Sequence, residues 1–449
     1  MSVTNLTSSK KPSLMHLTWP IFIELLMASL TGNVDQIMIS QYEEPALATI
    51  GTANTVILLF ILTFSVFSLA TTILISQYIG AEKKEILSTI YSLAIAVNTI
   101  LGVVVSAILV IFAAPIAEIM NVLPSQYDNF CGYVRITGGF LFTQAIFSTF
   151  TAILKSNAVT KPIMIISVLM NIVNIGLNFV LMYGIGPFPE LGIRGAAIAT
   201  VTSRILAVIM IIVFYIKTIR TKISIKKLVP FPKKILISML KIGLPSGGET
   251  VSYNFTQIII IAWINGFGEV QSTSKFYVTL FVLVSCMFSN AITQASQILV
   301  GYHIGAKNYD AAKKQTNKTL FIAITASGFV AFILWLLSPA IMNLLTDNPE
   351  IVVLVGKILL IDIFLEMGRA INVTMVRALQ AAGDTIFPII IGIISTWVLA
   401  VGLSAGLGIG LGIGLIGVWI AMASDEIIRG IIFIFRWRSD AWKNKDFVT

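Results

Sequence analysis

Two carboxylates lie in an almost entirely apolar stretch near the start of this 449-residue chain. Glu24 and Asp35 belong to the segment LMHLTWPIFIELLMASLTGNVDQIMISQ, residues 14–41. They are eleven residues apart, which is about three helical turns, so both would lie on nearly the same face. A helix of this length can cross a bilayer, where an ionised carboxylate costs about 2.5 to 3.5 kcal/mol. We therefore expect a protonatable site in a cavity; a hydrated position at the outer end of the helix is the alternative for Asp35.

Three amides recur at helical spacing farther along. Asn171, Asn174 and Asn178 are separated by three and four residues, which places them on one face of an apolar helix. This pattern favours the lining of a polar cavity, and hydrogen bonding between helices is the alternative. Thr200 can join the amides, because the small residues of its segment GAAIAT let two helices approach closely.

A second polar group occupies the other half of the chain. Glu249 opens a polar stripe, as Glu24 does in the first half. Glu366 and Arg369 are three residues apart and can pair, and so can Glu426 and Arg429. We favour a neutralising, structural role for these two pairs over a coupling role. Further polar residues of the apolar helices are Tyr253, Asn254, Gln257, Asn290 and Gln294.

The composition indicates which elements must position these residues. The chain is 57% hydrophobic and only 11% charged, whereas soluble domains carry about 25% charged residues. It is therefore predicted to be an all-α membrane protein with many spans. Two cysteines in apolar surroundings and two histidines argue against a disulfide scaffold, a metal site or imidazole catalysis. We predict that the protein is not an enzyme and has no cofactor or metal beyond a coupling ion.

Hydrophobic windows predict about twelve transmembrane helices. We place them at residues 13–41, 47–78, 86–115, 129–154, 160–184, 193–217, 234–265, 272–303, 311–341, 350–380, 385–409 and 412–436. The glycine-rich run GLSAGLGIGLGIGLIG, residues 402–417, is expected to lie between the last two spans. There it would serve close helix packing or an outer turn, because it lacks the Lys-Ser/Thr ending of a phosphate-binding loop.

Charge alternates between the loops in the way that the positive-inside rule describes. The net charge of +9 is therefore a topological signal and does not indicate nucleic-acid binding. It places both termini in the cytoplasm of a multi-pass protein of the cell membrane. The basic residues of the expected cytoplasmic side are Lys10, Lys11, Lys155, Lys161, Lys217, Arg220, Lys222, Lys226, Lys227, Lys233, Lys234, Lys307, Lys313, Lys314, Lys318, Arg436, Arg438, Lys443 and Lys445.

The two halves of the chain repeat each other. LTWPIFIE resembles IGLPSGGE, and TTILISQYIGAEKKE resembles ASQILVGYHIGAKNYD, at an offset of about 225 residues. An even number of spans per copy leaves both copies in one orientation, so we expect two parallel six-helix bundles with a substrate site near the membrane midplane. The predicted domains are an N-lobe at 1–217, a basic cytoplasmic linker at 218–233 and a C-lobe at 234–449.

Several motifs, taken in their order and spacing, resemble the multidrug and toxic compound extrusion (MATE) family over essentially the whole chain. They are WPIFIELL and VDQIMIS in the first span, QYIGA and YHIGA, NIVNIGLN, G-x-x-GAAIAT and LQAAGDTIFP. The resemblance implies a secondary active exporter that moves cationic or amphipathic compounds in exchange for protons or sodium. We expect a monomer in the lipid bilayer, with small molecules as its other partners.

The resemblance also implies site residues. Asp35, Asn174 and Thr200 match the family's coupling-ion site, whereas Asn178 stands where the family has an aspartate. We therefore expect protons rather than sodium as the coupling ion. Glu249 matches an acid in the family's seventh span, and the acid of its tenth span has no clean match. The predicted coupling-ion residues are Asp35, Asn174, Asn178, Thr200 and Glu249, and the predicted cavity residues are Glu24, Asn171, Tyr253, Asn254, Gln257, Asn290, Gln294, Glu366 and Arg369.

Two other functions are weighed against export. A flippase for a lipid-linked or anionic substrate would line its cavity with cations, for which the candidates are Arg135, Arg204 and Arg369. A membrane enzyme would need a nucleophile, a metal or an acid–base group, and the sequence offers no catalytic motif.

Overall fold

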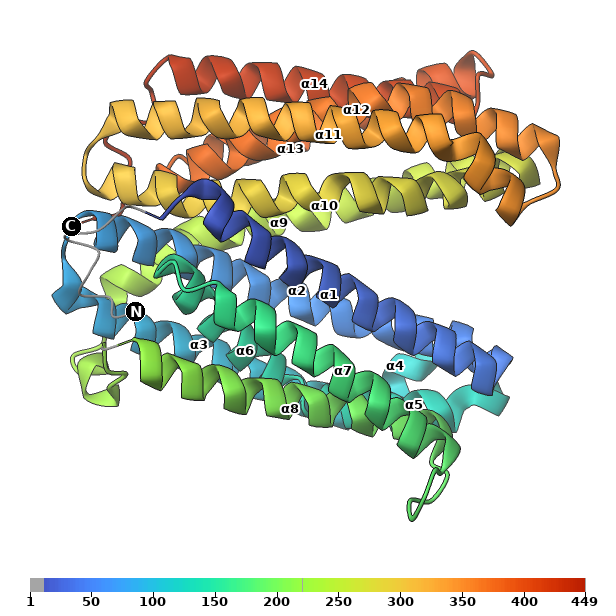
Figure 1. Cartoon of the computed structure of the whole chain (residues 1–449), viewed down its shortest axis with the longest axis horizontal. Coiled ribbons are helices and arrows are strands. Elements are labelled where there is room, and N and C mark those ends of the chain that lie inside the picture. The colour runs from blue at the N-terminus through green and yellow to red at the C-terminus, as the bar shows by residue number, and fades with distance from the viewer. Residues whose placement is uncertain (1–11, 220, 449) are drawn as a thin grey trace. The chain divides into compact units, whose positions relative to one another are not determined.

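The computed structural model describes residues 12–219 and 221–448, and all regular structure in these ranges is helical. Lys10, Lys11 and Arg220 of the expected cytoplasmic charge set lie outside the described residues. The chain divides into two compact units (Figure 1). Among the described residues, the first unit comprises 12–79 and 83–243, and the second comprises 80–82 and 244–448. The lobe limits at 217 and 234 stay a prediction.

The first unit holds the helices of the amino-terminal half. They are α1 (Leu14–Tyr42), α2 (Glu44–Gly80), α3 (Lys84–Ile111), α4 (Ala113–Ile119), η2 (Pro124–Gln126), α5 (Tyr127–Gly139), α6 (Phe142–Ser156), α7 (Lys161–Tyr183), α8 (Gly192–Thr218) and the short η3 (Ile225–Leu228).

The main part of the second unit begins at Leu244, inside α9. Its helices are α9 (Lys233–Gly266), α10 (Glu269–Gly305), α11 (Tyr309–Leu345), α12 (Pro349–Ala381), α13 (Ile386–Ser395), the π-helical η4 (Thr396–Leu403) and η5 (Ala405–Gly410), and α14 (Leu415–Arg438). Each predicted span therefore coincides with a helix or a consecutive set of helices.

The fourth predicted span is broken into two helices. α5 and α6 meet at a bend of 40°, where the expectation of one continuous helix over 129–154 is wrong. Gly138 lies so close to α3 that a Cβ atom there would approach Leu109 Cβ to 2.8 Å. The hydroxyl of Ser106 on α3 accepts a hydrogen bond from the Phe142 N–H at 3.0 Å. The break is thus stabilised because α3 supplies a partner for a backbone group that α6 leaves unpaired.

The glycine-rich run does not lie wholly between the last two spans. Residues 402–410 continue the eleventh span, mostly as π-helix, and only residues 411–414 form the turn before α14. Gly412 and Gly414 have φ angles of +68° and +65°, which glycine adopts without strain. Gly417 faces Leu407 closely enough that a Cβ atom would lie 2.8 Å from the Leu407 carbonyl carbon. Close packing and a turn are both present, but in consecutive parts of the run.

A stricter test, which requires a long apolar stretch with at most two charged residues, finds fewer spans among the described residues than the twelve predicted. Eight of the described helices are long and apolar enough to cross a membrane, and the bent α5–α6 pair counts as a ninth. The three other long helices, α9, α12 and α14, carry Glu249 and the buried ion pairs of the second unit. These charged residues lower the hydropathy of α9, α12 and α14, and for this reason the test does not find the three helices.

The carboxyl-terminal tail folds back onto the second unit. Trp442 is fully buried and stacks on Trp437, with 4.1 Å between ring centroids and 10° between ring planes. Asp384, in the turn between α12 and α13, pairs with Arg436 at 2.8 Å and with Lys445 at 2.9 Å. These contacts fasten the last residues to the ends of α12, α13 and α14.

Candidate functional site

Asp35 is buried in the first unit and is bonded by two uncharged side chains. The amide of Asn178 on α7 donates to Asp35 Oδ1 at 2.5 Å. The hydroxyl of Thr200 on α8 donates to Asp35 Oδ2 at 3.3 Å. Asp35 is only 7% exposed and Asn178 is fully buried. The alternative of a hydrated Asp35 at the helix end is therefore wrong, since a carboxylate with two neutral donors replaces its water with protein groups.

Of the other two amides of α7, Asn174 extends this network and Asn171 makes a separate contact. Asn174 donates from Nδ2 to the Thr200 hydroxyl at 3.4 Å. Asn171 accepts from the Thr31 hydroxyl of α1 at 2.5 Å. All three amides are buried, as one polar face of α7 requires. Among the three amides of α7, Asn178 is the one that bonds Asp35.

Small residues hold α7 and α8 close enough for these contacts. The two helices run side by side (Figure 1). A Cβ atom on Gly195 would lie 2.5 Å from the Leu181 carbonyl oxygen. Gly195 is five residues from Thr200, and Leu181 is three residues from Asn178. Gly195 and Leu181 therefore touch within about two helical turns of Thr200 and Asn178. This close approach positions the polar contacts of those two residues.

Two acceptor atoms in this network have no partner among the described residues. They are Oδ1 of Asn174 and Oδ1 of Asn178, both buried. Asn178 must present its NH₂ group to an ionised Asp35, which only accepts, and its oxygen is left unpaired. Unsatisfied buried acceptors beside a carboxylate are places where a proton donor or a small cation would be stabilised.

Glu24 belongs to a separate contact. It pairs with Lys155, the penultimate residue of α6, at 2.8 Å. Asp35 instead contacts α7 and α8. The two acids of α1 therefore have different partners, and the pair with Lys155 neutralises Glu24. The role of Glu24 in a substrate cavity stays a prediction.

Buried ion pairs dominate the second unit. Glu366 pairs with Arg369 on α12, as the sequence predicts. On α14, Arg429 pairs with Glu426 at 3.1 Å, also as predicted, and with Asp425 at 2.8 Å. One arginine thus compensates two carboxylates, and each pair forms within one helix turn.

Contacts between helices complete this network, and the sequence analysis missed them. Asp362 on α12 is buried and accepts a hydrogen bond from the indole of Trp419 on α14 at 3.2 Å. Asn372 on α12 donates to Glu426 Oε2 at 2.6 Å. Asp362 could have been found from its spacing of four residues before Glu366, which puts both acids on one face of α12.

α13 contacts acids from two neighbouring helices. Glu249 on α9 lies against it, because a Cβ atom on Gly392 would come within 2.8 Å of Glu249 Oε1. One turn later the Ser395 hydroxyl donates to Asp425 Oδ1 at 2.5 Å. The absence of a side chain on Gly392 thus leaves room for the Glu249 carboxylate.

The polar stripe of α9 continues beyond Glu249. Tyr253 and Asn254 are exposed and Gln257 is partly exposed. Asn254 donates to the carbonyl of Thr250 in its own helix at 2.8 Å. These side chains are available to contact a bound molecule, and that role stays a prediction.

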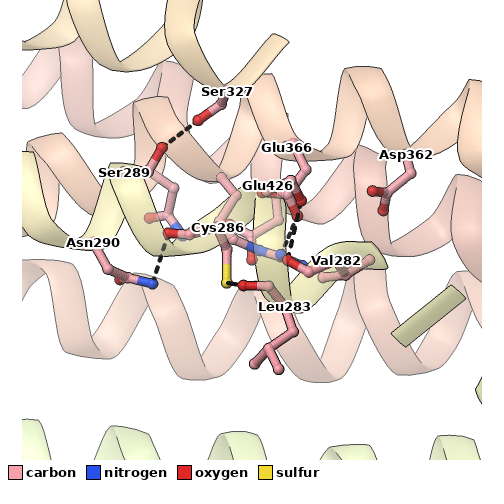
Figure 2. Close-up of polar contacts among 12 residues, drawn as sticks. Val282, Leu283, Cys286, Ser289, Asn290, Ser327, Asp362, Glu366 and Glu426 are labelled. Atoms are coloured by element: carbon pink, nitrogen blue, oxygen red, sulfur yellow. Dashed lines mark hydrogen bonds and ion pairs between the residues drawn. The ribbon is translucent and has the colours of Figure 1, made fainter. Parts of the chain in front are cut away.

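Figure 2 shows polar side chains of α10 near the acids of α12 and α14. Ser289 bonds Ser327 of α11, and both are buried. Asn290 donates to the Cys286 carbonyl at 3.0 Å, so its amide is satisfied within α10. Gln294, one turn farther on, is partly buried. The predicted cavity role of Asn290 and Gln294 is not tested by these contacts.

A third cluster joins α9, α10 and α12 nearer the other end of these helices. Arg377 donates to Gln297 Oε1 at 3.3 Å, and Gln297 donates to Gln380 Oε1 at 3.4 Å. Gln380 in turn donates to the Ser246 hydroxyl at 3.3 Å. Arg377 thus has an amide as its hydrogen-bond partner, and the Glu249 carboxylate interacts with it through charge.

A helical membrane protein with two repeated halves and buried carboxylates in both has the organisation of a secondary transporter. The MatE family model matches the chain twice, at residues 20–180 and 245–405. The second match begins and ends 225 residues after the first, which confirms the predicted repeat. The chain belongs to the MatE family.

Relatives agree with this assignment. The Uncharacterized transporter YisQ of Bacillus subtilis is 38% identical over 98% of this chain and 98% of its own. The Probable multidrug resistance protein NorM of Thermotoga maritima is 24% identical over 98% of this chain and 94% of its own. A crystal structure of MATE in the bent conformation superposes with a TM-score of 0.89 at 20% identity and covers 97% of this chain and 96% of that chain. The predicted family and the predicted twelve-helix fold are confirmed, and the protein is a multi-pass membrane transporter.

Proposed function

We propose that this protein exports organic cations or amphipathic compounds from the cell in exchange for protons, by alternating access between its two halves. The observation that carries the proposal is the buried Asp35 with its uncharged donors Asn178 and Thr200. A carboxylate in such a site changes its interactions completely when it gains a proton. We also propose that both termini lie in the cytoplasm and that the monomer is the working unit.

Protonation of Asp35 provides the difference between two states that coupling requires. The ionised form accepts from Asn178 and Thr200, but burial disfavours its charge. The protonated form is a donor and can be buried at lower cost, because the unpaired Asn178 Oδ1 can accept from it after rotation of the amide. The charged form is stabilised by water or by a cationic substrate. Proton and substrate therefore compete for the same carboxylate.

The membrane potential drives such an exchange only when net charge moves, as with a neutral amphipathic substrate or with more than one proton for each monovalent cation. One elementary charge that crosses a membrane potential of about 100 mV releases about 2.3 kcal/mol. This corresponds to a concentration gradient of roughly 50-fold, at about 1.4 kcal/mol for each factor of ten.

Protons are favoured over sodium because the site has a single carboxylate. Sodium would be held by the oxygens of Asp35 and Thr200 with the free amide oxygens of Asn174 and Asn178. These ligands supply one formal negative charge, where the family's site supplies two. Asn178→Asp would add the second charge, and we expect it to confer a dependence on sodium that the unmodified chain lacks.

A cationic substrate agrees with the charges inside the second unit. Away from the first turns of α9, α12 and α14, these helices carry five carboxylates with three arginines as partners or neighbours: Glu249, Asp362, Glu366, Asp425 and Glu426 with Arg369, Arg377 and Arg429. An interior with more acids than arginines is unsuited to an anionic headgroup. The name of the Thermotoga relative, a probable multidrug resistance protein, supports drugs as the substrates.

Transport by purified protein in liposomes tests the proposal. Uptake or release of an organic cation dye such as ethidium is measured under a pH gradient alone and under a sodium gradient alone. We expect pH-driven transport that Asp35→Asn abolishes while dye binding remains measurable. Asp347→Asn, which removes an exposed carboxylate from the turn between α11 and α12, is the matched control and should transport normally. Full transport by Asp35→Asn, or full export driven by sodium at constant pH, would refute proton coupling through Asp35.

Glu249 is proposed as the main carboxylate of the second half. It corresponds to Glu24 in the repeat and lies against Gly392 of α13. Glu249→Gln keeps the volume and removes the charge, so we expect export to fall strongly while the protein remains folded. Normal export by this variant at wild-type expression would contradict the assignment.

A further inference from the structure

The segment between α8 and α9 combines lysines with exposed apolar side chains. Ile225, Val229 and Phe231 are 80%, 79% and 50% exposed. No acidic residue occurs between positions 218 and 234 of the sequence. The lysines of this segment, all exposed, are Lys222, Lys226, Lys227, Lys233 and Lys234. The positive-inside rule accounts for the lysines, but it does not account for large apolar side chains beside them.

Hydrogen bonds hold this segment along α3. Ser88 on α3 donates to the Lys222 carbonyl at 2.6 Å, and Ser92 accepts from the Ser224 N–H at 2.9 Å. Ser92 is eight residues from the first residue of α3, Lys84, which is about 12 Å along the helix axis. The segment therefore folds back beside a spanning helix instead of extending away from its end.

The segment contacts the first turns of α3. α3 is one of the helices long and apolar enough to cross a bilayer. Two backbone groups of the segment, the Lys222 carbonyl and the Ser224 N–H, are satisfied by serines of α3. The hydroxyl of Tyr215 satisfies a third, the Thr221 carbonyl, at 2.5 Å. Backbone groups near hydrocarbon need such partners, because water is scarce there.

We propose that residues 222–234 form a binding site for anionic phospholipids of the adjoining membrane leaflet. Ile225, Val229 and Phe231 enter the boundary between headgroups and acyl chains, as the apolar residues of interfacial segments do. The lysine ammonium groups bind the lipid phosphates, to which they are attracted by charge and which their flexible side chains can reach. The proposal concerns the first unit and its linker, and it does not depend on the proposed transport reaction.

A fluorescent label at position 229 tests the site in the full-length protein. Val229→Cys is introduced with Cys131→Ser and Cys286→Ser, so that the label has one attachment point, and carries an environment-sensitive probe. The protein is reconstituted in nanodiscs of phosphatidylcholine with or without phosphatidylglycerol. Quenching by aqueous iodide and by a spin-labelled lipid is then compared. Lys314→Cys, on the exposed start of α11, is the matched control in the same cysteine-free background.

Phosphatidylglycerol is expected to shift the emission of the position-229 probe to shorter wavelength. Iodide quenching should fall and lipid quenching should rise, while the position-314 probe changes little. Lys222→Gln with Lys226→Gln and Lys227→Gln should remove this dependence on phosphatidylglycerol. Inorganic phosphate added to the neutral nanodiscs should not reproduce the shift, which distinguishes a lipid headgroup from free phosphate.

Other results overturn the proposal. Strong iodide quenching with little lipid quenching in both nanodiscs would mean that the apolar residues stay exposed and are available to a soluble partner. Strong lipid quenching with little iodide quenching in both nanodiscs would mean insertion without recognition of anionic lipid. Retained dependence in the triple lysine variant would exclude the lysines as the lipid ligands.

Discussion

Gly195→Ala should damage the Asp35 site without altering any residue that contacts Asp35. The added Cβ atom would lie 2.5 Å from the Leu181 carbonyl oxygen, and ordinary contact begins at 3.4 Å. Because the clash is with backbone, the two helices must separate by roughly 0.5 to 0.9 Å to relieve it. The bond from Asn174 to Thr200 is already 3.4 Å long, and a separation of this size breaks it.

The free-energy change can be isolated by comparison with Gly176→Ala. Gly176 is also inside α7, and a Cβ atom there would meet nothing within 4 Å. Both substitutions gain about the same helix propensity, about 1 kcal/mol, which cancels in the difference. Overpacking typically costs about 1 to 3 kcal/mol. Gly195→Ala should therefore be about 1 to 3 kcal/mol less stable than Gly176→Ala.

Unfolding of the two variants in the same detergent, followed by heat or denaturant, measures this difference. Dye transport under a pH gradient measures the effect on the site. We expect Gly176→Ala to behave like wild type in both assays and Gly195→Ala to lose stability and transport together. If the two variants unfold and transport alike, the packing of α7 on α8 does not position the site as argued.

Three further predictions concern the second unit. Arg429→Met leaves two buried carboxylates unpaired and should lower the free energy of unfolding by about 3 to 5 kcal/mol; an unchanged unfolding midpoint would contradict it. Trp442→Ala removes the stack on Trp437 and should lower the free energy of unfolding by about 3 to 5 kcal/mol. Proteolysis of the tail should become faster, and an unchanged rate of cleavage would contradict the prediction. Hydrogen bonds from Lys313 and, with a smaller effect, from Lys443 lower the pKa of the Asp440 carboxyl. This stabilisation is present above the unfolded-state pKa, about 3.9, and is lost as pH falls through the lower folded pKa, so wild type and Asp440→Asn should converge in thermal stability only at acid pH.

Local spacing explains which ion pairs were predictable. Glu366 with Arg369, and Glu426 with Arg429, are three residues apart, so helix geometry alone brings them together. The bond from Asn372 to Glu426 joins residues 54 positions apart. Its formation depends on how α12 and α14 pack, and no spacing along one helix reports that packing.

The Asp35 site shows the same division. The three-and-four spacing of the α7 amides predicts a common face, and all three amides are buried. That Asn178 bonds Asp35 while Asn174 bonds Thr200 depends on the axial register of α1, α7 and α8. A shift of one turn would exchange the two amides, and the sequence contains no direct measure of that shift.

The sequence by itself determined the helical class, the spans, the repeat and the family, because apolar length, local periodicity and motif order are properties of the chain alone. The tertiary structure decided the break in the fourth span, the π-helical end of the eleventh, the pair of Glu24 with Lys155 and the partners of Asp35. Each of these depends on contacts of a few ångströms between helices far apart in the chain. Such distances are set by the packing of the helices, and the hydropathy of a sequence window contains no information about them.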